Sequence, residues 1–395
     1  MELHGILSDK CIESMQNINR DNLCGRINVA FGVNRIVCIL GPRQCGKTTI
    51  ARTIFQSHGK TLNDSGYFDL EKPSDLEALQ TPDLVLSALR GLIVIDEIQR
   101  RPDLFSYLRY LHDQHFDQQF LILGSASREL INQSSESLAG RISFIEITAF
   151  SVEEVGDWRK LWAVGGFPRS YLLDSHNSFD WRKDYIKTYV EQDLRSLGFN
   201  FQTDTMRKLW LMLAHYHGQI LNASELASAL SVSQPTITQY LSYLSGGFMI
   251  RQLKPFHANL KKRQVKRPKL YYRDSGLLHY ALGIKTYADI FTHPKAGASF
   301  EGFAIEEVIK YHKVDTDDCY FWGSHNKAEL DLLILKDGKK LGFEFKLSDA
   351  PKLTPSMSIA YEDLALDELT VLYPGSRNYS LSEKVRCIPL AEYVL

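Results

Sequence analysis

The chain lacks any apolar run long enough to cross a bilayer. Its apolar runs are short: Ile36–Leu40 and Leu92–Ile95, for example, contain five and four residues, whereas a membrane-spanning helix needs about 20. The first sixteen residues also lack the apolar core of a secretory signal. We therefore expect a cytoplasmic protein without membrane contact.

Paired cysteine spacings are absent as well. Structural zinc sites and disulfide frameworks both need cysteines at short, recurring spacings, so we interpret the cysteines of this chain as reduced thiols. They are scattered over the sequence at Cys11, Cys24, Cys38, Cys45, Cys319 and Cys387. The 395 residues, 44% hydrophobic and 24% charged, have the composition of a globular protein of about two or three domains.

Acidic residues are missing from one long stretch, Leu226–Tyr272. A concentrated basic segment overlaps the end of this acid-free stretch. Such a segment is typical of a polyanion-binding surface, although a solvated basic hairpin has the same composition. This basic segment consists of Arg251, Lys254, Lys261, Lys262, Arg263, Lys266, Arg267, Lys269 and Arg273. Without these nine, 37 of the 46 basic residues remain against 47 acidic ones, a net charge of −10.

A glycine-rich loop follows the first apolar run. Residues 41–48, GPRQCGKT, match the pattern G-x-x-x-x-G-K-[ST], in which backbone N–H groups surround phosphate oxygens, Lys47 reaches the β- and γ-phosphates and Thr48 binds Mg²⁺. The motif therefore predicts ATP and Mg²⁺ as ligands. The predicted nucleotide-binding residues are Gly41, Pro42, Arg43, Gln44, Cys45, Gly46, Lys47, Thr48 and Thr49.

A second motif, LIVIDE (92–97), lies downstream. A buried strand here would place Asp96 at the sheet edge beside the glycine-rich loop, where its carboxylate can hold Mg²⁺. Glu97 would then be the general base that activates water. An acidic turn after a buried strand has the same sequence, but the upstream loop favours the catalytic interpretation.

Further apolar runs at 67–70, 120–123 and 144–147 alternate with helical patterns, which predicts a parallel sheet with helices on both faces. One run ends in LILGSAS (121–127), and LAGR (138–141) precedes another. Together with the two motifs above, these features resemble the AAA+ ATPases. The resemblance implies that Ser125 senses the γ-phosphate and that Arg141 is an arginine finger, with Arg100 and Arg128 as alternatives.

The AAA+ resemblance also bears on assembly. An arginine finger neutralises charge on the transferring phosphoryl group, and in AAA+ assemblies it usually comes from the neighbouring subunit. The resemblance therefore implies a homo-oligomer, often a ring. Arg169 is the nearest match to a second-sensor arginine.

The pattern changes after Phe150. Helices interrupted by GGFP (165–168) are expected over 158–199, followed by a helix-turn-helix outline over 224–246, a strand from Phe248 and the basic segment in the place of a wing. This arrangement predicts a DNA-binding winged helix. The predicted contacts are Thr236, Thr238 and Gln239 on the second helix and Lys261, Lys262, Arg263, Lys266, Arg267 and Lys269 in the wing.

A second set of polar residues lies near the carboxyl end. Glu301 falls in an expected helix, Asp331 on a strand (329–335), and Glu344 with Lys346 on the next strand (341–345), across a turn that contains Asp-Gly. The set resembles the PD-(D/E)xK nuclease fold, which implies carboxylates that bind Mg²⁺ and a lysine that orients the attacking water. A cross-strand cluster of ion pairs and a nuclease fold without catalysis are the alternatives.

The motifs DEIQRRP (96–102), YYRDSGL (271–277) and FEGF (300–303) extend the resemblance over nearly the whole chain. It is to a bacterial and archaeal family of AAA+ ATPases with a C-terminal domain of unknown function. The implied α/β fold has four parts: a P-loop ATPase core (1–150), a helical lid (151–205), a winged helix-turn-helix (206–290) and a restriction-endonuclease-like domain (291–395).

The predicted function is an ATPase that couples Mg²⁺-dependent ATP hydrolysis to the binding of DNA, including branched DNA. Residues 291–395 carry 12 basic and 17 acidic residues, so DNA would be held mainly by the winged helix. The alternatives are an ATP-regulated, Mg²⁺-dependent DNA nuclease and a nucleotide-dependent protein-interaction switch that binds no DNA.

Overall fold

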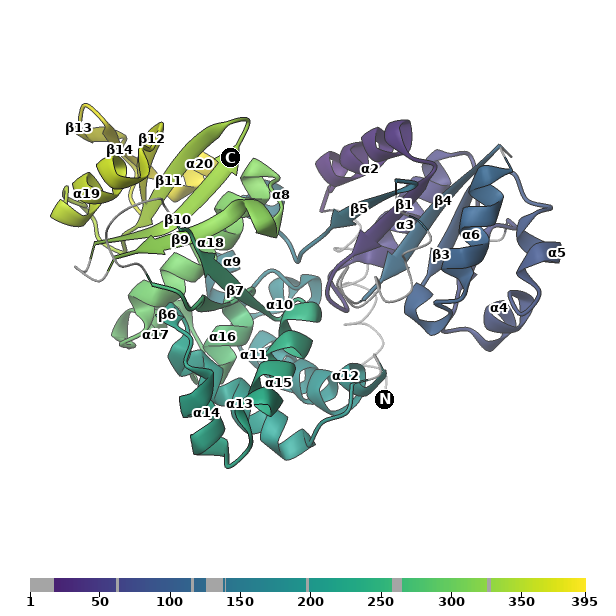
Figure 1. Ribbon diagram of the computed structural model, residues 1–395, viewed down its shortest axis with the longest axis horizontal. Helices are drawn as coiled ribbons and strands as arrows, with labels where there is room; N and C mark the ends of the chain where they lie inside the picture. Colours follow the sequence, from purple (N-terminus) through teal and green to yellow (C-terminus); the bar gives the residue numbers. More distant parts are fainter. Residues whose placement is uncertain are drawn as a thin grey trace. The chain divides into compact units, whose positions relative to one another are not determined.

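The computed structural model describes residues 18–61, 64–114, 117–125, 138, 140–196, 199–257, 265–324 and 328–395. The chain forms two compact units: unit 1 is built mainly from residues up to Ala149 and unit 2 mainly from those after it (Figure 1). The predicted boundaries at residues 205 and 290 lie inside unit 2. Within the described ranges, no helix is long and apolar enough to cross a membrane.

Unit 1 contains the predicted parallel sheet. Its five strands lie in the order β2-β3-β4-β1-β5, and every neighbouring pair is parallel. The strands are β1 (Ile36–Leu40), β2 (Tyr67–Asp69), β3 (Gly91–Asp96), β4 (Gln118–Gly124) and β5 (Ile142–Glu146). The strands β1, β3 and β4 are mostly apolar because helices cover both faces, so that both sets of alternating side chains are buried.

The helices of unit 1 make two cores, one on each face of this sheet. Ile36 and Cys38 belong to the core that includes α6, whereas Val37 and Ile39 belong to the core that includes α2 and α3. The helices are α2 (Asp21–Val33), α3 (Lys47–Ser57), α4 (Pro73–Ala78), α5 (Pro82–Leu86), the short η1 (Ile98–Arg100) and α6 (Leu104–Asp113).

Unit 2 is organised around a nine-stranded sheet in the order β13-β14-β12-β11-β10-β9-β7-β8-β6. The strands are β6 (Gln219–Ile220), β7 (Ile250–Pro255), β8 (Lys269–Tyr272), β9 (Cys319–Gly323), β10 (Glu329–Lys336), β11 (Lys339–Phe345), β12 (Glu368–Tyr373), β13 (Tyr379–Ser382) and β14 (Val385–Pro389). Parallel pairing of β7 with β9 joins the hairpin β7–β8 to the carboxyl-terminal strands. The sheet therefore continues across residue 290.

The helices of unit 2 flank this sheet (Figure 1). Those before the first strand are α8 (Val152–Val155), α9 (Trp158–Val164), α10 (Pro168–Leu172), α11 (Ser175–Thr188) with a π-helical turn (Tyr189–Asp193), α12 (Leu194–Ser196) and α13 (Thr203–Tyr216). Those after it are α14 (Ala223–Leu230), α15 (Gln234–Gly246), α16 (Ser275–Ala281), α17 (Tyr287–Thr292), α18 (Ala296–His312), the short η4 (Thr316–Asp318), α19 (Pro355–Leu364) and α20 (Leu390–Val394). Trp162 of α9 is fully buried and packs edge-on against Phe300 of α18.

Two local predictions in unit 2 are confirmed. The Asp-Gly sequence makes a two-residue turn between β10 and β11, with positive φ at Asp337 (50°) and Gly338 (75°). The GGFP sequence interrupts the helices: α9 ends at Val164, Gly165 has a φ of 81°, and α10 begins at Pro168. A Cβ atom at Gly165 would lie 2.2 Å from Asp274 Oδ1, so only glycine fits there.

Candidate functional site

The glycine-rich loop lies between β1 and α3, at the carboxyl edge of the unit 1 sheet. It turns sharply, with φ values of 61° at Gln44 and 100° at Gly46. The N–H of Gly41 donates to the carbonyl of Gly124 on β4 over 3.3 Å, and a Cβ on Gly41 would lie 2.3 Å from the carbonyl oxygen of Ile147. The loop is thus held close to the ends of its two neighbouring strands.

Lys47 begins α3 and folds back onto the loop. Its Nζ donates to the carbonyl oxygens of Gly41 (2.9 Å) and Pro42 (2.8 Å), and the residue is only 5% exposed. The Arg20 guanidinium links the loop to the segment after β5, because it donates to the carbonyls of Cys45 (3.1 Å) and Thr148 (3.2 Å). The ammonium group therefore lies within the loop's curve, bound to neutral acceptors.

Asp96 ends β3 beside the loop, as predicted. Its Oδ2 accepts a hydrogen bond of 2.8 Å from the hydroxyl of Thr48 and a longer one of 3.4 Å from Tyr67. Burial raises the pKa of Asp96, and the hydrogen bond from Thr48 opposes this shift. The two predicted Mg²⁺ ligands are therefore in direct contact.

Glu97 follows in a left-handed backbone conformation, with φ at 58°. Its N–H donates to Asp96 Oδ1 (2.9 Å), while its carboxylate accepts from the amide of Gln99 and from the hydroxyl of Ser125 (3.3 Å to Oε1). Gln99 Oε1 in turn accepts from the N–H of Ser125 (3.4 Å). The structure thus brings together Glu97, the predicted base, and Ser125, the predicted sensor. It adds Gln99, which contacts both residues and which the sequence motifs did not identify.

The predicted arginines have different surroundings. Arg141 precedes β5 at the amino edge of the sheet, opposite the loop, and its guanidinium binds both carboxylate oxygens of Asp113 (2.8 and 3.2 Å). Arg100 approaches Glu71 (3.9 Å), which also pairs with Arg43 of the loop (3.2 Å). Arg169 is exposed on α10 in unit 2, and Arg128 lies outside the described residues.

In unit 2, the four residues predicted as a nuclease site converge. Lys346 Nζ donates to Glu344 (2.6 Å) and lies 3.8 Å from Asp331, whose Oδ2 accepts from the N–H of Phe345 (3.0 Å). Burial raises the pKa of Glu301 to about 7 and that of Glu344 to about 8, and the charge of Asp331 adds to both shifts. Among the described residues, however, no group of carboxylates, histidines or cysteines has metal-binding geometry.

Lys269 joins this carboxylate cluster, which corrects the prediction that it contacts DNA. Its side chain is 6% exposed, and its Nζ pairs with Glu329 and lies 3.5 Å from Glu301 and 3.9 Å from Asp331. A lysine buried among carboxylates cannot reach a phosphate backbone. The nuclease resemblance, which names residues after 290 only, gave no sign of this residue.

Other members of the basic segment are also neutralised inside unit 2. Arg251 and Arg273 both pair with buried Glu306, and Lys254 pairs with Asp317 (2.8 Å). The predicted contacts Thr238, Gln239, Lys266 and Arg267 are exposed and Thr236 is half-buried, whereas Lys261, Lys262 and Arg263 lie outside the described residues. The basic surface of the described part is therefore smaller than the sequence suggested.

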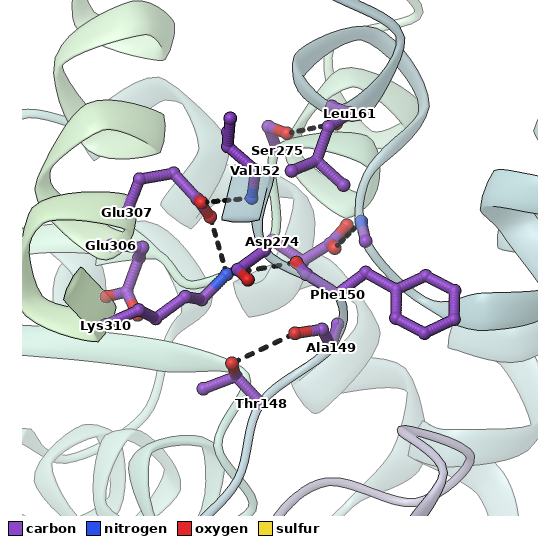
Figure 2. A network of polar contacts seen from close by, with 12 residues as sticks. Thr148, Ala149, Phe150, Val152, Leu161, Asp274, Ser275, Glu306, Glu307 and Lys310 are labelled. Atoms are coloured by element: carbon purple, nitrogen blue, oxygen red, sulfur yellow. Dashed lines mark hydrogen bonds and ion pairs between the residues drawn. The ribbon is translucent and has the colours of Figure 1, made fainter. Parts of the chain in front are cut away.

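The motifs GGFP and YYRDSGL pack against each other. Asp274 accepts from the N–H groups of Gly166 (2.8 Å) and Leu277 (2.9 Å). Beside them, Glu307 and Lys310 of α18 bind the backbone of Val152 and Phe150 at the start of unit 2 (Figure 2). These motif residues thus stabilise the fold of unit 2.

Three family models match the chain in succession. An AAA domain model matches residues 33–156, which hold the sheet and loop of unit 1. A domain of unknown function (DUF8612) matches residues 155–288, and a second domain of unknown function (DUF4143) matches residues 296–393. The fold and the model together define unit 1 as a P-loop ATPase domain of the AAA class.

Two curated relatives match over almost the whole length. The uncharacterized protein Rv2008c of Mycobacterium tuberculosis is 42% identical over 390 residues, covering 98% of this chain and 87% of the relative. The uncharacterized protein Mb2031c of Mycobacterium bovis matches with the same values. The chain belongs to the family of these proteins.

A solved structure, the Walker-type ATPase PABY2304 of Pyrococcus abyssi, aligns with 67% of this chain and 96% of its own. The identity is 11% and the TM-score 0.47.

Proposed function

We propose that the protein binds ATP and Mg²⁺ at residues 41–49, hydrolyses the ATP, and couples turnover to DNA held by unit 2. One observation carries the ATPase part of the proposal. A continuous set of hydrogen bonds runs from Thr48 through Asp96 to the N–H of Glu97, whose carboxylate is held by Gln99 and Ser125.

The loop supports phosphate binding. Its backbone N–H groups and the amino end of α3 form a partly positive surface. Lys47 now donates to two neutral carbonyl oxygens, and a phosphate oxygen would replace them because hydrogen bonds between charged groups are stronger. Lys47 would then contact the β- and γ-phosphates.

The donor atoms beside the loop fit Mg²⁺. Thr48 and Asp96 offer two oxygen atoms 2.8 Å apart, and Mg²⁺ prefers oxygen ligands. These two residues would hold the ion, whose role in phosphoryl transfer is to neutralise charge on the phosphate oxygens. A nearby cation would also favour the ionised form of Asp96, against the effect of burial on its pKa.

Glu97 is positioned to act as the general base. Gln99 and Ser125 fix the direction of its carboxylate, which would accept a proton from the water that attacks the γ-phosphorus. The left-handed backbone at Glu97 is a conformation that non-glycine residues adopt mainly where the surrounding structure requires it.

Arg141 supports an oligomeric version of this mechanism. It lies at the sheet edge opposite its own loop, so it would serve the nucleotide of a neighbouring subunit after leaving Asp113. The alternatives are Arg128 and Arg100, and Arg100 shares Glu71 with Arg43 of the loop.

DNA binding is supported by the arrangement around α15. The elements follow one another as α13, β6, α14, α15, β7 and β8, and the three strands pair as β6-β8-β7. This order supports the proposal of a winged helix. Thr238 and Gln239 are exposed on α15, and Lys266 with Arg267 is exposed before β8. These residues would contact bases and phosphates.

Metal-dependent cleavage of DNA is the second candidate. It is favoured by the convergence of Glu301 on α18, Asp331 on β10 and Glu344 on β11, together with Lys346 directly after β11. Carboxylates and a lysine in this arrangement can bind a divalent cation and orient water.

The decisive experiment is ATP turnover by the full chain, with and without duplex and branched DNA, beside Glu97→Gln. We expect turnover that DNA stimulates, and a Glu97→Gln variant that retains ATP without hydrolysing it. Exposed Glu77 on α4 gives the matched control Glu77→Gln, which should behave as the unsubstituted protein does.

Full turnover in Glu97→Gln would refute the assignment of the base. Turnover that ignores DNA, together with no salt-sensitive DNA binding, would refute the coupling to DNA and favour the nucleotide-dependent protein switch. Cleavage of DNA that survives Asp331→Ala would place any nuclease site elsewhere.

A further inference from the structure

The carboxylate cluster of unit 2 contains an internal cation. Lys269 Nζ pairs with Glu329 Oε1 and lies 3.5 Å from Glu301 Oε1 and 3.9 Å from Asp331 Oδ1. Three carboxylates thus surround one ammonium group. Lys346 takes the other side of the cluster, 2.6 Å from Glu344 and 3.8 Å from Asp331.

Lys269 is fixed in this place by β8. Tyr271, two residues further along the strand and so on the same face, donates a hydrogen bond of 2.5 Å to Glu301. The hairpin that carries both residues pairs with β9 through β7, so the ammonium group is held by the sheet. The side chain is 6% exposed, which leaves little room for water around it.

We propose that Lys269 is a tethered counter-ion that occupies the position of a divalent cation among Glu301, Glu329 and Asp331, and thereby closes a latent metal site. Its removal would open that site to Mg²⁺ or Mn²⁺. The donors have the chemistry such ions prefer, oxygen atoms from several carboxylates. In the present arrangement, with the ammonium group among them, these described carboxylates lack metal-binding geometry.

The charge balance explains why the Lys269 ammonium group and a divalent metal ion exclude each other. When the carboxyl groups of Glu301, Glu329, Asp331 and Glu344 are all ionised, Lys269 and Lys346 offset two of their four negative charges. A divalent ion would have to approach oxygen atoms to about 2.1 Å, within the space that Nζ occupies, and would be repelled by the ammonium charge at short range.

This inference goes beyond both proposed functions, because it depends neither on DNA cleavage nor on ATP hydrolysis. It concerns only which cation the cluster binds. If the protein cuts DNA with Mg²⁺, the inference requires Lys269 to withdraw first. If the protein never cuts DNA, Lys269 remains as the permanent partner of the carboxylates.

The test measures Mn²⁺ binding to the nucleotide-free full chain by calorimetry and by the electron paramagnetic resonance of free Mn²⁺. All proteins carry Asp96→Asn, so that the site in unit 1 does not contribute. Lys269→Met, which keeps the length of the side chain and removes its charge, should bind Mn²⁺ at least about tenfold more tightly. Adding Asp331→Asn should abolish the gain, and Lys266→Met, at an exposed lysine of the same segment, should show none.

A folded Lys269→Met variant without tighter binding would overturn the proposal. If Lys269→Met does not fold, the proposal is tested by Mn²⁺ binding to the Asp96→Asn chain, in which Lys269 is intact. Mn²⁺ binding equal to that of its Asp331→Asn variant would support a closed site, whereas tighter binding that Asp331→Asn removes would show that the metal and Lys269 coexist and would overturn the proposal.

Discussion

The two polar sites of this protein differ in what neutralises their charges. In unit 1, Lys47 donates to neutral backbone carbonyls, and Asp96 accepts from the hydroxyl groups of Thr48 and Tyr67. In unit 2, Lys269 and Lys346 are paired directly with carboxylates. The first arrangement leaves a cation and a carboxylate ready for new charged partners, whereas the second has already used its charges internally.

The same contrast extends to the basic segment. Its arginines at 251 and 273 pair with Glu306, and although burial alone would raise the pKa of Glu306, these two arginines lower it to about 2. Part of the positive charge that the sequence offers to a polyanion is thus paired within unit 2.

The largest effect should come from breaking this internal pairing. Glu306→Gln leaves two buried arginines without a counter-charge, and we expect a loss of about 3–5 kcal/mol of unfolding free energy. Chemical denaturation measures it, with Glu383→Gln at an exposed position as the control. A loss as small as that of the control would mean that these basic residues are available to other partners.

The next largest effect should come from replacing Lys47, the lysine of the glycine-rich loop. Lys47→Ala removes the ammonium group that would contact the phosphates, and we expect ATP turnover to fall at least about 100-fold with weaker ATP binding. Lys72→Ala, at an exposed lysine of the same unit, is the control and should retain turnover. Unfolding free energy should change little in either variant, because the present partners of Lys47 are loop carbonyls.

A smaller effect should follow from pH. The pKa of Glu344 is raised from 4.5 to about 8, so between these values the folded state holds a proton that the unfolded state releases. The contribution of this proton to the free energy of unfolding is fully present below pH 4.5 and decreases as the pH rises toward 8. Relative to Glu344→Gln, the protein should lose about 2–3 kcal/mol of unfolding free energy between pH 5 and pH 7. A constant difference would show that the cluster does not hold this proton.

The smallest effects should come from the exposed basic residues. Lys266→Ala and Arg267→Ala should each weaken DNA binding a few-fold and reduce the slope of log affinity against log salt by about 1. Lys187→Ala, exposed on α11, is the control. Unchanged affinity and slope in both variants would remove these residues from the DNA surface.

Unit 1 could be predicted closely because its signals are local. Apolar runs gave the five strands, and the spacing within GPRQCGKT placed Lys47 and Thr48 at the start of a helix. The carboxyl ends of parallel strands meet at one edge of the sheet, so Asp96 and Ser125 could be expected beside the loop. The contact of Gln99 with Glu97 could not, because it depends on the turn of η1.

The convergence of Glu301, Asp331, Glu344 and Lys346 could be predicted from strand periodicity and from the resemblance to a nuclease fold. The addition of Lys269 could not. It depends on the pairing of β7 with β9, which brings a residue of the basic segment next to carboxylates from a later part of the chain.

The sequence by itself determined the strands of unit 1, the phosphate-binding loop, the Asp337-Gly338 turn and the helix break at Gly165, because each follows from backbone geometry or side-chain periodicity over a few residues. Only the tertiary structure decided which charges meet. The acid-free stretch ending at Tyr272 finds its counter-charges on α18, η4 and β10, since the partner of a buried charge is set by the sheet order and register, which join residues far apart in the chain.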